Sequence, residues 1–269
     1  MIRLVVLDLD GTLLNSEKHI AECDREAVDR LVESGVTVTI FTGRNYHSAL
    51  PYVEELGVNV PVVFQNGALI YDFSSKRVLK STRLEENVAL KLIRSAREEG
   101  IFTIVYTDFF DLKDMFIESS YTGPFLRYLA SNSWRLVMID DLTKISENPV
   151  EIALIGREED IKNVISDLEN VSIVKGSVLE GESFYEVFGP RCSKGDALDF
   201  ITEHMGIDSE EIIFIGDGYN DLEIMKKVGI AIAMGNSPDE IKKVADWITA
   251  TNDECGVAKA IAEFFPSIL

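Results

Sequence analysis

Short apolar runs rich in β-branched residues alternate with amphipathic stretches along the first part of the chain. The runs 4–7, 36–41 and 61–64 predict buried strands. Between them, residues 24–34 place their apolar side chains on one helical face, and residues 46–56 also predict a helix. This alternation is typical of strands and helices that wind a mainly parallel sheet.

The same pattern returns near the C-terminus, where helices are expected over 194–205 and 222–228 and strands over 212–215 and 230–233. The stretch between about 82 and 188 differs, because it holds most of the aromatic residues. We therefore expect a Rossmann-like, doubly wound α/β core with a mainly parallel sheet, and a second α/β domain inserted into it.

The expected boundaries place residues 1–81 and 189–269 in the core and residues 82–188 in the insertion. The elements expected within the insertion are strands over 101–106, 152–155 and 184–188 and helices over 85–99 and 158–168.

The chain has 269 residues, with 46 acidic and 26 basic side chains and a formal charge of -20. This balance argues against nucleic acid or an anionic membrane as a partner, because both need clustered basic residues. Both predicted domains carry an excess of acidic residues, so neither of them has a net positive charge. Since 46% of the residues are apolar, the chain can still bury a core.

The cysteines, Cys23, Cys192 and Cys255, are widely spaced, odd in number and in no CxxC pair. We expect buried thiols in a reducing compartment, and neither a disulfide framework nor a zinc site. No run approaches the length of a membrane span. A soluble cytoplasmic protein is expected.

Two carboxylates, Asp8 and Asp10, stand where the first strand ends. Ligands of open α/β sheets bind outside the carboxyl ends of the strands, so these acids are expected to face a site. Two unit charges about 4 Å apart repel by roughly 4 kcal/mol at an effective dielectric near 20, so without a cation the pair would be destabilising or partly protonated. A turn with an Asp at a helix N-cap would explain one of these acids but not both.

A second acidic cluster, residues 216–221, follows another apolar strand and precedes a helix. It does not match the dinucleotide-binding fingerprint G-x-G-x-x-G, because Asp221 replaces the third glycine. Its carboxylate would repel the pyrophosphate of a dinucleotide. Together with Asp8 and Asp10, the acids of this cluster, among them Asp217, predict an oxygen-rich pocket of the kind that selects Mg²⁺.

Two further segments supply hydrogen-bond donors and positive charge. Thr42 and Gly43 follow the second strand, where a hydroxyl and the N–H groups of a helix N-terminus suit an anion. Lys194 opens a helix, which is unfavourable for a cation on dipole grounds unless an anion shares the site. The pattern therefore indicates an anion bound beside the metal.

In this order, the segments resemble the haloacid dehalogenase (HAD) superfamily of phosphohydrolases. The matching motifs are DxDGT at 8–12, the threonine Thr42, the lysine Lys194 and GDxxND at 216–221. The Cof-type subfamily is the most similar, through NGA at 66–68, MGN at 234–236 and TxxNDExGV from Thr249 to Val257. The resemblance implies a catalytic core with an inserted C2B-type cap.

The resemblance also implies a phosphatase that forms an aspartyl-phosphate. Asp8 would attack phosphorus, and Asp10 would protonate the leaving oxygen and then deprotonate the attacking water. Mg²⁺ would be held by the Asp8 carboxylate, the Asp10 backbone carbonyl and Asp217. Thr42 and Lys194 would bind the phosphoryl group, assisted by N–H groups near Gly43. Asn220 would also contact the substrate, and Asn66 and Asp221 are expected to orient the site from outside.

The implied cap would cover the sheet edge and exclude water when closed. Its stretch 106–128 is rich in aromatic residues. We expect these to pack mainly in the core of the inserted domain, because large apolar side chains usually lie inside, although a substrate-facing rim is the alternative.

The predicted function is Mg²⁺-dependent hydrolysis of small phosphorylated metabolites, with sugar phosphates as the leading class. A sugar-phosphate mutase or phosphotransferase is one alternative, and a non-catalytic regulator that binds a phosphorylated ligand is another. Dehalogenation is disfavoured, because it needs neither a leaving-group acid such as Asp10 nor a metal ligand such as Asp217. The acidity of the chain makes a bound metal necessary for binding an anionic substrate, and favours compact monophosphates.

Overall fold

The computed structural model describes residues 1–268, and this part of the chain divides into two compact units. The first unit combines Met1–Lys80 with Ser193–Leu269, and the second is Ser81–Cys192. The sequence-based boundaries of the insertion, 82 and 188, lie within the second unit.

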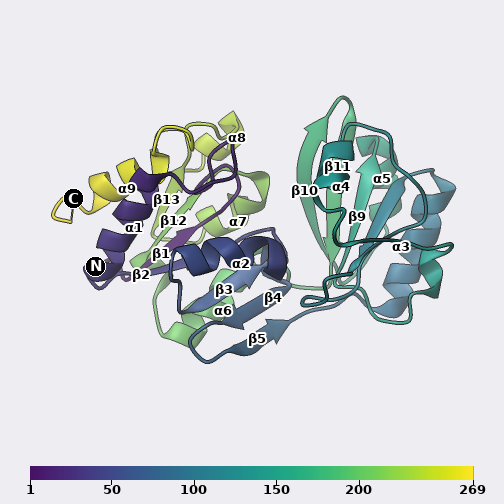
Figure 1. The fold of residues 1–269 in the computed structure, drawn as a ribbon, viewed down its shortest axis with the longest axis horizontal. Coiled ribbons are helices and arrows are strands. Elements are labelled where there is room, and N and C mark those ends of the chain that lie inside the picture. Colours follow the sequence, from purple (N-terminus) through teal and green to yellow (C-terminus); the bar gives the residue numbers. More distant parts are fainter. Residues whose placement is uncertain (269) are drawn as a thin grey trace. The chain divides into compact units, whose positions relative to one another are not determined.

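A parallel sheet lies at the centre of the first unit (Figure 1). Its strands are β1 (Leu4–Leu7), β2 (Thr37–Ile40), β12 (Ile212–Gly216), β13 (Ile230–Ala233) and β14 (Trp247–Ile248). Their order is β14-β13-β12-β1-β2, so the direction in which strands are added reverses between β1 and β12. Such a switch point is where open α/β sheets bind ligands. The expected α/β fold with a mainly parallel sheet is confirmed.

A smaller sheet continues this core beyond β2. It contains β3 (Pro61–Phe64), β4 (Leu69–Asp72) and β5 (Arg77–Ser81), in that order. A parallel bridge between Phe41 and Val63 joins β3 to the end of β2. The connection from β3 to β4 is a 3₁₀ turn, η1 (Gln65–Gly67), whose residues all have positive φ.

Helices cover both faces of the parallel sheet, as a doubly wound fold requires. Leu4 and Val6 pack against α6 (Lys194–Met205), α7 (Leu222–Met225) and α8 (Asp239–Lys242). The alternate residues of β1 face the other way, toward α1 (Glu22–Glu33) and α9 (Gly256–Phe264), which lie side by side (Figure 1). The remaining helical elements of this unit are α2 (Tyr46–Glu55), η3 (Ser209–Glu211) and η4 (Tyr219–Asp221).

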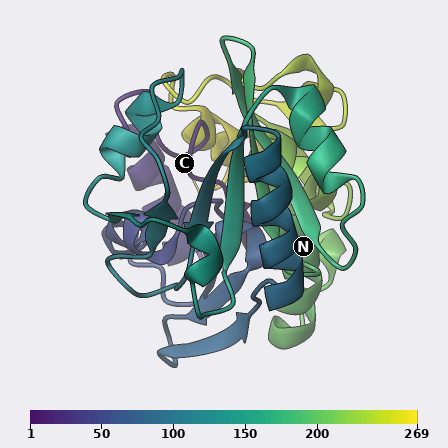
Figure 2. The same ribbon diagram turned by 90° about the vertical axis from the view of Figure 1, so that its right-hand side faces the viewer.

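The second unit is built on a mixed sheet with the order β10-β11-β9-β6-β7-β8. The strands are β6 (Phe102–Tyr106), β7 (Met115–Ile117), β8 (Leu136–Met138), β9 (Glu151–Gly156), β10 (Ser172–Leu179) and β11 (Glu182–Phe188). Figure 2 shows α3 (Glu86–Glu98) and α5 (Glu158–Ile165) side by side on one face of this sheet. The other helical elements are α4 (Leu126–Ser131) and η2 (Leu142–Lys144).

The aromatic stretch of the second unit packs mainly inside it. Tyr106, Phe109 and Phe125 are buried, and Tyr106 and Phe125 belong to an apolar cluster with Met115. Phe110 is the exception, with 40% of its surface exposed. Among residues 1–268, no helix is both long enough and apolar enough to cross a membrane.

Cys23 and Cys255 form a disulfide that joins the first turn of α1 to the residue before α9. The expectation of an unpaired thiol at each cysteine is therefore wrong for this pair, and the inference of a reducing compartment loses that support. Cys192 is buried and takes no part in this disulfide. The pairing is not visible in the sequence, because the two cysteines are 232 residues apart and only the packing of α1 against α9 brings them together.

We predict that Cys23→Ser destabilises the protein by about 2–4 kcal/mol, because the disulfide closes a very long loop of the unfolded chain. Urea unfolding measures the change, and the parent protein in dithiothreitol should match the variant. In denaturant without reductant, the thiol of Cys192 should be the one that reacts. Reaction of all three thiols would show that the disulfide is absent.

Candidate active site

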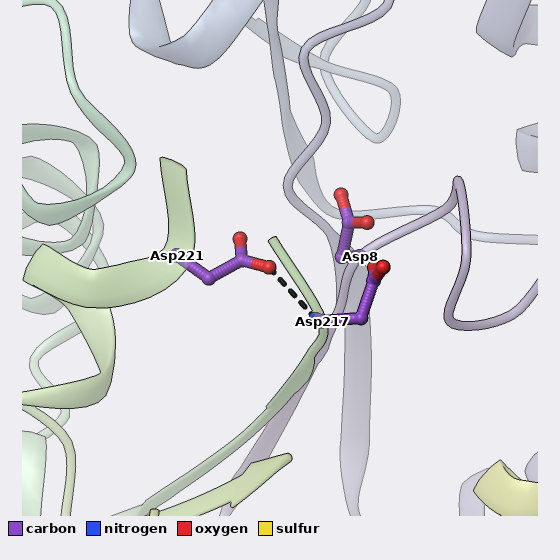
Figure 3. A group of neighbouring side chains, drawn as sticks. All are labelled: Asp8, Asp217 and Asp221. Atoms are coloured by element: carbon purple, nitrogen blue, oxygen red, sulfur yellow. Dashed lines mark hydrogen bonds between the residues drawn. The ribbon is translucent and has the colours of Figure 1, made fainter. Parts of the chain in front are cut away.

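The candidate site lies at the carboxyl ends of β1 and β12, which are neighbouring parallel strands. Asp8 follows β1 and Asp217 follows β12, while Asp221 ends the short η4 turn. Carboxylate oxygens of these residues lie within 4.8 Å of one another (Figure 3). The topology therefore brings together acids that are more than two hundred residues apart in the sequence.

Lys194 links two of these acids. Its ammonium group donates to Asp8 Oδ1 at 2.5 Å and to Asp221 Oδ1 at 2.6 Å. The lysine is the first residue of α6, after the N-cap Ser193, and its side chain is fully buried. A buried ammonium group is stable only with close partners of opposite charge, so this bridge fixes both carboxylates.

Asp221 accepts hydrogen bonds from backbone N–H groups as well as from Lys194. Its Oδ2 accepts hydrogen bonds from the backbone N–H groups of Asp217 and Gly218, both at 2.9 Å (Figure 3 shows the first). Both oxygens of Asp221 are therefore engaged by the protein. This arrangement fits the expected role of Asp221 in orienting the site, and it leaves Asp8 and Asp217 better placed to bind a cation.

Burial is the main reason why the pKa values of Asp8 and Asp217 rise. The pKa of Asp8 lies well above its ordinary value, because burial and the charges of Asp221 and Asp217 outweigh the attraction of Lys194. Burial and the charge of Asp221 raise the pKa of Asp217 to about 7, although Thr12 donates a hydrogen bond to Asp217 Oδ1 at 3.0 Å. The cluster thus carries more negative charge than Lys194 can balance.

Asp10 is not in the group of carboxylates formed by Asp8, Asp217 and Asp221, and two cationic side chains pair with its carboxylate. Arg44 donates to both Asp10 oxygens, from Nε at 2.5 Å and Nη2 at 2.7 Å, and Lys18 donates to Oδ1 at 2.7 Å. Although burial raises the pKa of Asp10, Arg44 and Lys18 lower it to about 2. Asp10 is therefore an ionised, well-paired carboxylate.

Sequence reasoning did not assign Arg44 or Lys18. Arg44 had a signal, because it directly follows Thr42 and Gly43; its guanidinium group also lies 5.0 Å from the centre of the Tyr52 ring. No sequence pattern marked Lys18, since its position depends on a left-handed backbone conformation with φ of 64°.

Hydrogen bonds link three loops that carry predicted site residues, namely Thr42 with Gly43, Asn66, and Asn220. Thr42 is buried, and its carbonyl accepts from the backbone N–H of Asn66 at 3.1 Å. Asn220 Nδ2 donates to Asn66 Oδ1 at 2.9 Å. A side chain at Gly43 would begin 3.3 Å from Asn66 Oδ1, so the loops pack closely there. The structure therefore brings Thr42, Gly43, Asn66 and Asn220 together.

A cluster of carboxylates, a buried lysine and a threonine loop thus lie at the switch point of a parallel sheet, where open α/β sheets bind ligands. The chain belongs to the family of haloacid dehalogenase-like hydrolases, because residues 5–261 match the sequence model of that family. The predicted membership of the HAD superfamily is thereby confirmed. Hydrolases of this family generally use a divalent metal, and the oxygen donors of Asp8 and Asp217 suit such a cation.

Several similar proteins are named phosphatases, in agreement with the predicted enzyme class. The chain is 29% identical over 271 residues to the 5-amino-6-(5-phospho-D-ribitylamino)uracil phosphatase YitU of Bacillus subtilis, with 97% of each chain covered. It is 26% identical over 272 residues to the pyridoxal phosphate phosphatase YbhA of Escherichia coli, covering 96% of this chain and 97% of the other. A solved haloacid dehalogenase-like hydrolase from Bacteroides thetaiotaomicron is 31% identical, with a TM-score of 0.82 over 98% of this chain and 100% of that one.

We predict that Lys194→Met destabilises the metal-free protein by about 3–5 kcal/mol, because it leaves the buried Asp8 and Asp221 without their cation. The matched control is Lys227→Met, which breaks a partly exposed pair with Asp199 and should change stability by about 0–1 kcal/mol. Urea unfolding measures both. The loss of stability in Lys194→Met should be smaller at pH 5 than at pH 8, since protonation neutralises Asp8, whose pKa is raised. Equal effects of the two variants at pH 8 would contradict the role of the bridge.

Proposed function

We propose that this protein is a Mg²⁺-dependent phosphatase of small phosphorylated metabolites that works through an aspartyl-phosphate on Asp8. The observation that supports this most is the placement of Asp8 at the end of β1. Lys194 Nζ donates to its Oδ1 at 2.5 Å, and the carboxylate of Asp217 lies close by. An oriented carboxylate next to a cation site suits in-line attack on phosphorus.

In the proposed reaction, an Asp8 oxygen forms a bond to phosphorus while the bond to the leaving oxygen breaks. Asp10 gives a proton to that oxygen and later takes one from the water that hydrolyses the aspartyl-phosphate. Mg²⁺, held by Asp8, Asp217 and the Asp10 backbone carbonyl, would neutralise charge on the phosphoryl oxygens. Lys194, Thr42 and N–H groups near Gly43 would bind those oxygens.

The pairing of Asp10 with Arg44 and Lys18 adds a condition to this mechanism. With a pKa of about 2, Asp10 is ionised at neutral pH, so it holds no proton to donate and is only a weak base. We infer that a bound phosphate competes with Asp10 for Arg44 or Lys18, because both are cations. Loss of either partner would raise the pKa of Asp10 and allow it to act as an acid.

We assign the unit Ser81–Cys192 the role of a C2B-type cap that sets substrate specificity, and Met1–Lys80 with Ser193–Leu269 that of the catalytic core. The substrate class follows from chemistry and from the relatives. Both named relatives act on a small molecule that carries a phosphate group. A chain with a net charge of -20 should favour compact monophosphates over polyanions. Sugar phosphates and phosphorylated sugar alcohols are therefore the first compounds to assay.

We predict that Asp8→Asn lowers kcat for p-nitrophenyl phosphate by about a thousandfold or more while the fold survives, because it removes the nucleophile. Asp199→Asn, the same change on the surface of α6, should keep the parent rate. Steady-state kinetics and circular dichroism provide the two readouts. Hydrolysis by Asp8→Asn at the parent rate would exclude Asp8 as the nucleophile.

We predict that Mg²⁺ binds about tenfold more tightly at pH 8 than at pH 6, because the Asp217 carboxyl, with a pKa of about 7, must lose its proton to bind a cation. Above that pKa the group is ionised, so affinity rises with pH. Calorimetric titration of EDTA-treated protein measures this. Asp217→Asn should remove most of the binding. Equal affinity at both pH values, or full phosphatase activity in EDTA, would contradict the metal role.

A further inference from the structure

The C-terminal segment 249–257 and the MGN motif have no part in the proposed mechanism, yet they contact the loop that follows Asp10. We name this loop, residues 11–16, the catalytic loop. It begins at Gly11, directly after Asp10, and contains Thr12, whose hydroxyl donates to Asp217. Its backbone position therefore affects both the proposed acid and the proposed metal ligand.

Asn252 attaches the segment to the middle of the catalytic loop. Its side chain is buried, and Nδ2 donates to the Leu14 carbonyl oxygen at 2.8 Å. The backbone N–H of Asn252 donates to Asn236 Oδ1 at 3.0 Å. One side chain thus holds the loop, while the main chain of the same residue fixes Asn236.

Asn236 completes the connection at the start of the loop. Its Nδ2 donates to the Gly11 carbonyl oxygen at 2.8 Å. Gly11 has a φ of 81°, and a side chain added there would begin 2.3 Å from Asp217 Oδ2. The peptide that Asn236 holds is therefore packed directly against Asp217, so a shift of this peptide would move the carboxylate.

Asp253 attaches the far end of the catalytic loop. Its carboxylate accepts from the backbone N–H of Ser16 at 2.8 Å and from the Ser16 hydroxyl at 2.6 Å. Together, Asn236, Asn252 and Asp253 hold the loop backbone at its beginning, middle and end. Side-chain contacts to successive backbone groups of one loop restrict its conformation more than contacts to mobile side chains would.

The segment that provides these contacts is itself fixed. Thr249 Oγ1 donates to the Gly256 carbonyl oxygen at 2.6 Å and closes the segment on itself. Cys255, within the segment, is linked to Cys23 by the disulfide. Asp24 Oδ1 accepts from the backbone N–H of Ala258 at 2.7 Å and ties the start of α9 to α1. Because the segment itself is held in place, its hydrogen bonds restrict the position of the catalytic loop.

We propose that Asn236 and Asn252 are positioning residues for phosphoryl transfer, which hold the catalytic loop so that Asp10 and Asp217 keep their places relative to Asp8. This inference rests on the proposed function. Displacing catalytic groups by a fraction of an ångström raises the energy of the transition state more than that of the bound substrate. Loss of these contacts should therefore lower kcat more than it changes KM.

Asn236 offers the sharpest test, because its side chain is largely exposed and its replacement creates no cavity. Asn236→Asp keeps the acceptor for the Asn252 N–H but removes the donor to Gly11. Asn87→Asp, at an exposed position of α3 in the other unit, adds the same charge and is the matched control. Asn252→Ala removes the donor to Leu14. Its control is Thr39→Val, which removes a buried hydrogen bond of 2.6 Å from a side chain to the Pro61 carbonyl.

The experiment measures kcat and KM for p-nitrophenyl phosphate in saturating Mg²⁺, together with thermal melting. We expect kcat to fall about 10- to 100-fold for Asn236→Asp and Asn252→Ala, with KM changed less than about threefold. Both controls should keep the parent kcat, and Asn236→Asp should melt close to Asn87→Asp. If Asn252→Ala does not fold, Asn236→Asp alone decides.

Two results would overturn the inference while the proposed function stands. One is an active parent enzyme with Asn236→Asp within twofold of its kcat. The other is a loss of kcat in Asn252→Ala that Thr39→Val reproduces, which would indicate a general effect of destabilisation. A parent protein that hydrolyses no phosphate ester would reject the proposed function, and this inference with it.

Discussion

The buried bridge from Lys194 to Asp8 and Asp221 is the interaction on which the rest of the site depends. An ammonium group with no exposed surface requires carboxylate partners, and those partners stand on different elements: Asp8 after β1 and Asp221 before α7. Asp221 in turn fixes the backbone at Asp217. One bridge therefore sets the positions of the proposed nucleophile, the proposed metal ligand and the N-terminus of α6, and each would be displaced without it.

The balance of charge in this cluster explains why the site suits a divalent cation. Lys194 offsets only part of the charge of Asp8, Asp217 and Asp221, so burial and mutual repulsion raise the pKa values of Asp8 and Asp217. Arg44 and Lys18 hold Asp10 as an anion, and its charge adds to the rise in the pKa of Asp217. The two acids of the DxD motif thus have opposite environments, because the pKa of Asp8 is raised and that of Asp10 is lowered. The acidity of the whole chain adds to the need for a cation.

Much of the core could be predicted from the sequence, because its strands are apolar runs that end at polar residues. The strands 4–7, 61–64 and 230–233 and the helix 194–205 begin and end where the pattern predicts. Strands such as β8 and β14 were missed, since they are very short and form only through their neighbours. Asp8, Asp217, Asp221 and Lys194 were found because motifs mark the ends of their elements. The orientation of Asp10, the role of Lys18 and the disulfide depend on loop conformation and helix packing, which periodicity does not encode.

The central claim is that Asp8 carries the phosphoryl group during turnover. The most direct measurement is mass spectrometry of the protein quenched with acid while it hydrolyses a phosphate ester in Mg²⁺. The account predicts one phosphoryl group on the peptide that contains Asp8, and none on the same peptide of Asp8→Asn. A phosphoryl group on a different residue, or its absence during rapid turnover, would contradict the account.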